Sequence, residues 1–322
     1  MNAPRTRVQR RPVHGVLLLD KPLGLSSNQA LQKAKWLLRA EKAGHTGTLD
    51  PLATGVLPLC FGAATKFSQL HLDADKTYVA TARLGVKTST GDAEGEVIAE
   101  RAVQVTAEDL ARVALQFTGP IRQVPPMHSA LKKDGKALYE YAREGIEVER
   151  APRDVVVHEL ALAFIEADLV RIVARVSKGT YIRTLGEDIG EALGCGAHLR
   201  SLRRLSTGDF DATRCITLDG LEAMDETERL ACLLPVESLV SGHGRVTLQA
   251  DDAARFLSGL RRRGEWADAD EIAVFGSQPV AFLGTAHARA RELIPGRLLN
   301  PIEIQQILLN APVNATFCET TP

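Results

Sequence analysis

Residues 44–55, GHTGTLDPLATG, hold three glycines and a proline together with one histidine and one aspartate. This density of glycine and proline is typical of a shaped loop. Pro51 disfavours helical geometry for the residue before it, so the carboxylate of Asp50 is expected to point in a fixed direction among neighbouring apolar residues. A fixed, partly desolvated carboxylate could act as a nucleophile or a base, although Asp-Pro is also a common turn former.

The sequence predicts that a mixture of strands and helices positions this loop. Residues 15–20 form an apolar run typical of a buried strand, and Pro22 and Gly24 then turn the chain. A helix capped by Ser26, Ser27 or Asn28 is predicted to run to Arg39. Further along the chain, the patterns predict strands at 76–84 and 169–176 and helices at 107–117 and 181–193.

Two regions differ from this mixture of strands and helices: residues 124–152, and the part of the chain after about residue 245. The 124–152 stretch is polar and rich in Pro and Gly around a short helix at 137–143, as in a binding loop or lid, with disorder as the alternative. Near residues 241–245 the charge changes sign, and strands expected at 274–283 and 294–299 indicate a small β-rich domain. We therefore divide the chain into a basic tail (1–13), a main domain that contains the Asp50 loop (14–245) and a C-terminal domain (246–322).

Charge is distributed unevenly along a chain whose net charge is only −1. Residues 1–214 hold 30 Lys and Arg against 25 Asp and Glu, whereas residues 215–322 hold 9 against 15. Residues 1–214 could therefore bind a polyanion, although ordinary variation of surface charge can produce the same excess of Lys and Arg. In the acidic part, Arg261, Arg262 and Arg263 form a local basic cluster that could contact phosphates or simply be solvated.

Composition also bears on the compartment and on metals. No apolar run is long enough to span a membrane and the N-terminus lacks a secretory core, so we expect a cytoplasmic protein. Five scattered cysteines indicate free thiols. Cys195 and His198 have C-x-x-H spacing, but no second pair accompanies them, so no metal site is predicted.

Further segments of the chain carry recognisable motifs in a fixed order. They are residues 15–27 (GVLLLDKPLGLSS), 76–80 (KTYVA) with 83–85 (RLG), 123–132 (QVPPMHSALK), 178–185 (KGTYIRTL) and 196–204 (GAHLRSLRR). Through these segments and residues 44–55, the chain resembles the TruB family of tRNA pseudouridine synthases over about residues 14–210. The C-terminal region resembles the small RNA-binding domain of that family, of the PUA type, only loosely.

The resemblance implies a mixed α/β (α+β) fold, in which a large, mainly antiparallel sheet is flanked by helices. It also implies that one uridine in the T loop of tRNA, uridine 55, is isomerised to pseudouridine without metal or organic cofactor. The uracil is detached from C1′ of its ribose, turned, and rejoined through C5. Because the base must first be flipped out of the RNA, at a cost of a few kcal/mol, the enzyme needs a pocket that stacks on it. The expected partner is the T stem-loop of tRNA, bound by a monomer.

By the same resemblance, Asp50 is the catalytic residue, and Arg183 pairs with it to keep the carboxylate ionised. Tyr78 stacks on the flipped base and lies near the edge that loses a proton. Tyr181 helps to form the uridine pocket, and Leu202 forms its apolar wall. Since Tyr181 and Arg183 follow a turn at two-residue spacing, we expect an extended segment that points both side chains to one side.

Three further residues have roles implied by the family. His45 would fill the space that the flipped uridine leaves, or else cap the turn at Gly44. Lys21 would brace the active-site loop together with Pro22, or contact a phosphate. Asp92 corresponds to an acidic residue near the RNA, although a solvated turn is the simpler interpretation.

Two other functions remain open at this point. The chain could be an RNA-binding folding factor for tRNA whose catalysis is dispensable. It could also be a glycosidase with Asp50 as nucleophile, but no second carboxylate can be assigned as the acid.

Overall fold

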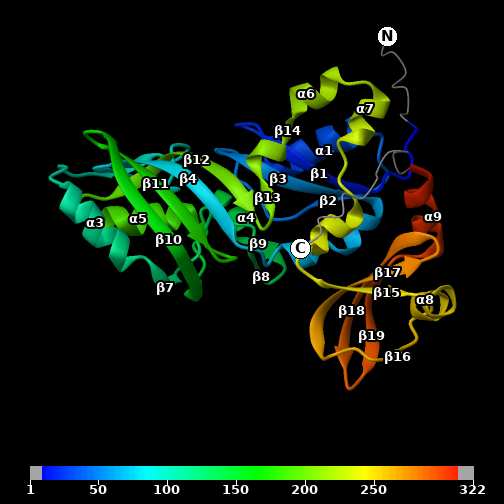
Figure 1. Cartoon of the computed structure of the whole chain (residues 1–322). Coiled ribbons are helices and arrows are strands. Elements are labelled where there is room, and N and C mark those ends of the chain that lie inside the picture. Colours follow the sequence, from blue (N-terminus) through cyan, green and yellow to red (C-terminus); the bar gives the residue numbers. More distant parts are fainter. Residues whose placement is uncertain (1–8, 311–322) are drawn as a thin grey trace, which may run out of the picture.

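The computed structural model describes residues 9–310, which form a large sheet with flanking helices and a small C-terminal sheet (Figure 1). The ten-stranded sheet has the order β14-β1-β3-β12-β4-β11-β10-β7, with β2 on β3 and β13 on β12. Within the described chain, its parallel pairs are β1–β14 and β3–β12, and the other pairs are antiparallel. The strands are β1 Gly15–Lys21, β2 Ala43–His45, β3 Ala53–Phe61, β4 Lys76–Leu84, β7 Gly119–Gln123, β10 Arg153–Glu166, β11 Leu169–Val176, β12 Ala197–Thr207, β13 Phe210–Asp211 and β14 Ile216–Thr217.

Helices and two short hairpins surround this sheet. The helices are α1 Ser27–Leu37, α2 Ser68–His71, α3 Ala107–Gln116, α4 Leu138–Arg143, α5 Ile182–Ala192, α6 Leu218–Ala223 and α7 Glu226–Ala231, with 3₁₀ turns at Gly62–Lys66, Ala212–Arg214 and Val236–Val240. The hairpins are β5 Val86–Thr88 with β6 Val97–Glu100, and β8 Lys132–Lys133 with β9 Lys136–Ala137. The mixed α/β architecture with a mainly antiparallel sheet, predicted from the sequence, is confirmed.

Local sequence rules explain the element that leads into the catalytic loop. Ser26 caps α1 by accepting the Gln29 N–H at 3.2 Å, while the Gln29 side chain accepts the Ser26 N–H at 2.8 Å. The helix ends at Leu37, two residues before the predicted end, because Arg39 adopts a positive φ of 52°.

The core of the large sheet lies on one face of β4 and β11. Residues of β4 alternate between buried and less buried positions along the whole strand, which is why the period-two pattern located it correctly. Helix α5 covers this face, and its Ile182, Leu185 and Ile189 pack into the same apolar cluster as Tyr78 and Ile172. The Asp50 loop lies at the edge of this cluster, since Leu49 is one of its members.

The second sheet has the order β15-β17-β18-β19-β16. Its elements are β15 Gly244–Leu248, α8 Ala250–Leu257, β16 Arg262–Arg263, β17 Ala269–Ser277, β18 Val280–Arg289, β19 Glu292–Leu298 and α9 Pro301–Asn310. The prediction of one strand over 274–283 was wrong, because Gln278 and Pro279 form the turn of a hairpin there. The prediction of a small β-rich unit is confirmed.

The small sheet packs against the large one, next to α9 at one end of the molecule (Figure 1). Val16 and Val56, on the face of β1 and β3 turned away from α1, share an apolar cluster with Phe282 of β18. The Phe67 and Phe282 rings have centroids 5.2 Å apart, and the Lys66 Nζ lies 2.6 Å from a carboxylate oxygen of Glu303. The two sheets therefore meet at a packed apolar junction with an ion pair beside it.

Several smaller predictions can be compared with the described residues. Of the predicted basic tail, residues 1–8 lie outside them, while Arg10 donates to the Ala40 carbonyl and Arg11 pairs with Glu226. Cys60, Cys195, Cys215 and Cys232 are free thiols, and Cys318 lies outside the described residues. Between residues 9 and 310 no helix is long and apolar enough to cross a membrane.

Candidate active site

Asp50 lies in the loop between β2 and β3. Its carbonyl accepts the Ala53 N–H at 3.0 Å, which closes a turn over Pro51. Leu49 and Ala53 on either side are buried, whereas 38 % of the Asp50 side chain is exposed. The backbone of Asp50 is thus anchored in the core while its carboxylate reaches the surface of the site.

Arg183 contacts three segments of the chain: the Asp50 loop, the turn that holds Thr90 and Asp92, and the segment around His128. Its side chain is 5 % exposed, and its Nη2 lies 2.8 Å from Asp50 Oδ2. Its Nη1 lies 3.5 Å from Asp92 Oδ2, and the guanidinium also donates to the carbonyls of Thr90 (3.1 Å) and His128 (2.6 Å). The predicted approach of Arg183 to Asp50 is therefore present, and Asp92 is a second carboxylate on the same cation.

Asp92 is not the solvated turn that its sequence context allows. It is buried, and its Oδ1 accepts hydrogen bonds from the Thr90 hydroxyl (2.6 Å) and the Glu94 N–H (3.1 Å). These bonds hold its other oxygen toward Arg183. The spacing of the residues does not reveal this pairing, because 91 positions separate Asp92 from Arg183 in the chain.

Burial and neighbouring charges shift the pKa values of Asp50 and Lys21. Burial is the largest influence on the pKa of Asp50 and raises it above the ordinary value; the Arg183 guanidinium lowers it, and the Asp92 carboxylate raises it. Burial likewise lowers the pKa of Lys21 to about 8, against the opposing effect of Asp50. Arg183 thus offsets part of the cost of keeping Asp50 ionised.

Lys21 ends β1 and is fully buried. Its Nζ donates to the carbonyls of Pro22 (2.9 Å) and Leu25 (2.5 Å), and the Gly24 N–H in the same turn donates to the Pro51 carbonyl at 2.9 Å. This geometry fits the predicted bracing of the active-site loop. It does not fit the alternative of a phosphate contact, because a buried ammonium presents no free face.

Leu202 forms apolar surface beside the loop. It belongs to β12 and lies opposite Ala53 of β3 and Ala80 of β4. Tyr78 belongs to the same apolar cluster as Leu202 and Leu49. The structure therefore places Leu202 next to the Asp50 loop and Tyr78 in the apolar core that the loop joins.

Tyr181 is placed differently from the prediction. It is the N-cap of α5, with extended backbone angles, and Arg183 belongs to the first turn of the helix. The predicted helix over 181–193 is therefore present, whereas the extended segment expected to carry both Tyr181 and Arg183 was wrong, because α5 begins at Ile182. Gln123 fixes the Tyr181 backbone on both sides, accepting its N–H at 3.0 Å and donating to its carbonyl at 3.3 Å. Burial raises the pKa of Tyr181, and the Asp50 carboxylate also raises it.

His45 lies on the short strand β2, at the start of the loop. Its Nδ1 is buried and has no partner among the described residues. Burial is the largest cause that lowers the pKa of His45, and the charge of Arg204 lowers it as well. A ring that is neutral at neutral pH suits stacking against a base.

Three residues that contact the site, Arg204, Ser27 and Gln123, had no role at the site in the sequence analysis. Arg204 is 1 % exposed; its Nε donates to the Val56 carbonyl at 2.6 Å, and its Nη1 lies 3.3 Å from where a Cβ on Gly47 would sit. All three residues fall within segments that resemble the family, but the sequence does not reveal which groups they contact.

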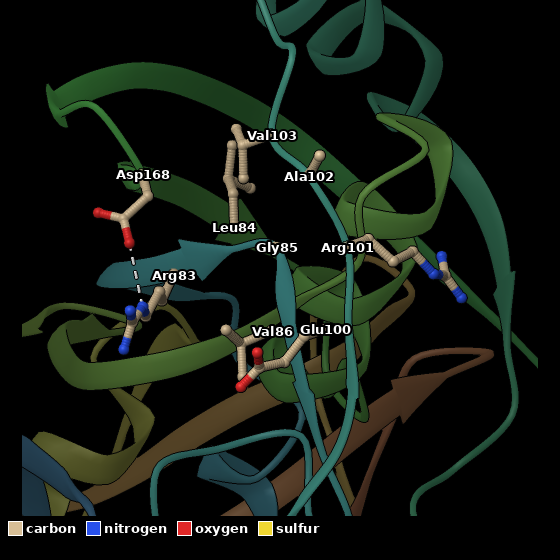
Figure 2. Close-up of a pocket in the computed structure, with 9 residues that line it drawn as sticks. All are labelled: Arg83, Leu84, Gly85, Val86, Glu100, Arg101, Ala102, Val103 and Asp168. Carbon is tan, nitrogen blue, oxygen red and sulfur yellow. Dashed lines mark hydrogen bonds and ion pairs between the residues drawn. The ribbon is translucent and has the colours of Figure 1, made fainter.

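A hollow of about 450 Å³ lies elsewhere, at the end of β4 (Figure 2). Arg83 and Asp168 form an ion pair of 3.0 Å at its edge, and none of the predicted site residues lines it. Glu100 and Asp168 also line it, but neither belongs to the site predicted from the sequence, so we place the chemistry at Asp50. Among residues 9–310, no three His, Cys, Asp or Glu side chains are grouped as a metal would require.

The described site can be compared with known proteins. Residues 35–182 match the TruB family pseudouridylate synthase N-terminal domain, and residues 183–241 match the tRNA pseudouridylate synthase B C-terminal domain. The chain is 65 % identical over 317 residues to tRNA pseudouridine synthase B of Verminephrobacter eiseniae, covering 96 % of each. The chain belongs to the TruB family. The relative of that name from Cupriavidus pinatubonensis is 55 % identical over 305 residues, covering 91 % of this chain and 96 % of its own.

A solved structure supports the TruB family assignment at the level of the fold. A chain of an H/ACA RNP bound to a substrate RNA containing 2′-deoxyuridine superposes with a TM-score of 0.66 at 25 % identity, over 89 % of this chain and 86 % of that one. The family predicted from the sequence is confirmed, whereas the roles of the individual site residues stay predictions.

Proposed function

We propose that this TruB family chain isomerises the T-loop uridine of tRNA, uridine 55, to pseudouridine, with Asp50 as the catalytic residue and no metal or organic cofactor. The proposal rests on the 2.8 Å contact between Asp50 and Arg183 at the edge of the apolar cluster that contains Leu49. The relatives that share most of the chain carry the name tRNA pseudouridine synthase B, which supports tRNA as the substrate.

The reaction breaks the N1–C1′ bond, forms a C5–C1′ bond, removes the hydrogen of C5 and returns a proton to N1. An ionised carboxylate beside the sugar can begin this by attack at C1′, by addition to C6 or by removal of a sugar proton. All three routes need Asp50 charged and aimed, and Arg183 serves both needs. Tyr78 stacks on the flipped uracil and assists removal of the C5 proton.

The remaining residues bind the RNA or support the loop. Tyr181 and Leu202 form the uridine pocket, and His45 stacks in the gap left by the flipped base. Lys21 braces the loop from behind. Asp92 holds Arg183 in the orientation that faces Asp50.

Asp50→Asn tests the proposal, since it removes the charge and keeps the shape. A T-arm stem-loop carrying tritium at uridine C5 should release tritium with the parent protein, while the variant slows roughly 10⁴-fold or more and keeps its RNA affinity. Asp168→Asn, which alters an aspartate ion-paired far from the loop, is the matched control and should retain the parent rate. If the activity of Asp50→Asn stays within about tenfold of the parent, Asp50 only shapes the turn and is not the catalytic residue.

A second function, that of a tRNA folding factor with dispensable catalysis, makes the opposite prediction for the parent protein. It would bind the stem-loop at stoichiometric concentration without releasing tritium. The contact between Asp50 and Arg183 argues for catalysis, because folding RNA does not require a carboxylate held at this position.

We also propose that residues 124–152 are an RNA-binding excursion. The β8–β9 hairpin carries Lys132, Lys133 and Lys136 there, and Lys136 pairs with Glu144 at 2.5 Å. When RNA binds, Lys136 would leave its carboxylate partner, and these lysines would contact RNA phosphates instead. Hydrogen exchange of these amides should slow when the stem-loop binds, and equal protection with and without RNA would contradict the proposal.

The C-terminal domain, residues 246–322, is proposed as a PUA-like unit that extends the RNA footprint beyond the T arm. Arg261 and Arg263 share Glu292, at 3.3 and 3.1 Å, so their charge is partly compensated in the free protein. Replacing both with Gln should weaken affinity for full-length tRNA and reduce its salt dependence, leaving affinity for the T-arm stem-loop unchanged. Equal loss with both RNAs would argue against a separate footprint.

We propose finally that the protein acts as a monomer in the cytoplasm. Light scattering at micromolar concentration should give the mass of one chain. A stable mass of two chains would contradict this.

A further inference from the structure

Ser27 is the first residue of α1, and it is 2 % exposed. Its Oγ accepts the Leu49 N–H at 2.7 Å and donates to the Leu49 carbonyl at 2.9 Å. One hydroxyl has the donor and the acceptor capacity for both bonds. Ser27 thereby satisfies both backbone polar groups of the residue that precedes Asp50, across 22 positions of the chain.

The two bonds to Leu49 also restrain the backbone of Asp50, the next residue. The Leu49 carbonyl and the Asp50 nitrogen belong to one rigid peptide plane, so a bond to the carbonyl fixes the plane in which Asp50 begins. On the other side of Asp50, Pro51 restricts the backbone, and its carbonyl accepts the Gly24 N–H at 2.9 Å. The Asp50 backbone is therefore held from both sides by the turn and helix that follow β1.

We infer that Ser27 is a positioning residue for the catalytic carboxylate, an inference that rests on the proposed function. Arg183 restrains the tip of the Asp50 side chain, and Ser27 restrains the peptide from which the side chain departs. Without the hydroxyl, the Leu49 peptide loses its partners, and Asp50 shifts relative to both Arg183 and the flipped base. Misplacement of a reacting group by about 1 Å costs on the order of 10²-fold in rate.

Ser27→Ala should slow the single-turnover release of tritium by about 10- to 10²-fold at saturating enzyme, with RNA affinity within about twofold of the parent. Because the shifted Asp50 loses part of its interaction with Arg183, its pKa rises, and the acid limb of the pH profile moves to higher pH. A residue that only stabilised the fold would lower the melting temperature without moving that limb.

Ser26→Ala is the matched control. Ser26 precedes Ser27 directly and also loses a hydroxyl bonded to a backbone N–H, but its partner is Gln29 of α1 and not the loop. This variant should have a lower melting temperature with the parent rate and pH profile. A loss of rate equal to that of Ser27→Ala would show that destabilised α1, and not the bond to Leu49, slows the reaction.

Ser27→Cys covers the case in which Ser27→Ala does not fold, because a thiol has nearly the size of a hydroxymethyl group and is a weak hydrogen-bonding group. A folded Cys variant that is slowed, with its acid limb moved to higher pH, supports the inference. Parent-like rate and pH profile in either folded variant would overturn it. If the proposed function itself fails, the parent protein releases no tritium, which distinguishes the two failures.

Discussion

Replacing Arg183 by Gln removes the positive charge beside Asp50 and keeps a polar side chain of similar length. The guanidinium lies 2.8 Å from Asp50 and 3.5 Å from Asp92, so the variant leaves two neighbouring carboxylates without their shared cation. Arg183 lowers the pKa of Asp50 in the parent, whereas burial and Asp92 raise it. Its removal should therefore raise the pKa of Asp50 further.

The size of this shift follows from the contact distance and the exposure. A cation in direct contact lowers the pKa of a carboxylate by about 1 to 3 units. Because 38 % of the Asp50 side chain is exposed, solvent screens the pair, and we expect the effect of Arg183 on the pKa of Asp50 to lie in the lower part of that range. The repulsion that Asp92 then exerts acts in the same direction.

In the proposed mechanism the ionised form of Asp50 is the active one, so activity should be lost as the pH falls through its pKa. Single-turnover tritium release, measured between about pH 5 and 9, should place the acid limb of Arg183→Gln at a higher pH than that of the parent. Arg183→Lys keeps the charge without the planar fork, and its acid limb should stay near that of the parent while its plateau rate falls. Melting temperatures of both variants would identify any loss of folding.

An acid limb of Arg183→Gln that coincides with the limb of the parent would refute the reasoning. It would mean that Asp50 does not depend on Arg183 for its charge, or that Asp50 does not titrate in the rate-limiting step.

Three other predictions concern the site and its framework. Tyr78→Phe keeps the stacking ring and loses the hydroxyl, so single-turnover release should slow about 10²- to 10⁴-fold with unchanged RNA affinity; a parent-like rate would limit Tyr78 to stacking. Burial lowers the pKa of Lys76 from 10.5 to about 8, so between these pH values the unfolded chain binds the extra proton and this residue makes the free energy of unfolding rise with pH. Lys76→Met should flatten that rise in urea titrations, and an unchanged slope would assign it to another group. Phe282→Ala opens a cavity at the junction of the two sheets and should lower the free energy of unfolding by about 3 to 5 kcal/mol, whereas a loss below about 1 kcal/mol would mean that the junction contributes little.

Part of the fold could be predicted because its determinants act over a few residues. β4 and β11 have the predicted bounds because one face of each strand is buried and the pleat repeats every two residues. The start of α1 follows from the Ser26 cap. The turn at Gln278 and Pro279 was missed because apolar residues continue on both sides of it, so the pattern of hydrophobicity shows no break.

The sequence by itself determined the family, through ordered segments that carry Asp50, Tyr78, Tyr181 and Arg183, and it determined the rigid backbone of Asp50 through Pro51. Only the tertiary structure decided which polar groups satisfy one another. Asp92 as the second partner of Arg183, and Ser27 as the partner of Leu49, depend on elements that meet across many residues. Local preferences carry no information on such contacts, because the partner of a buried polar group is set by which elements pack together around it.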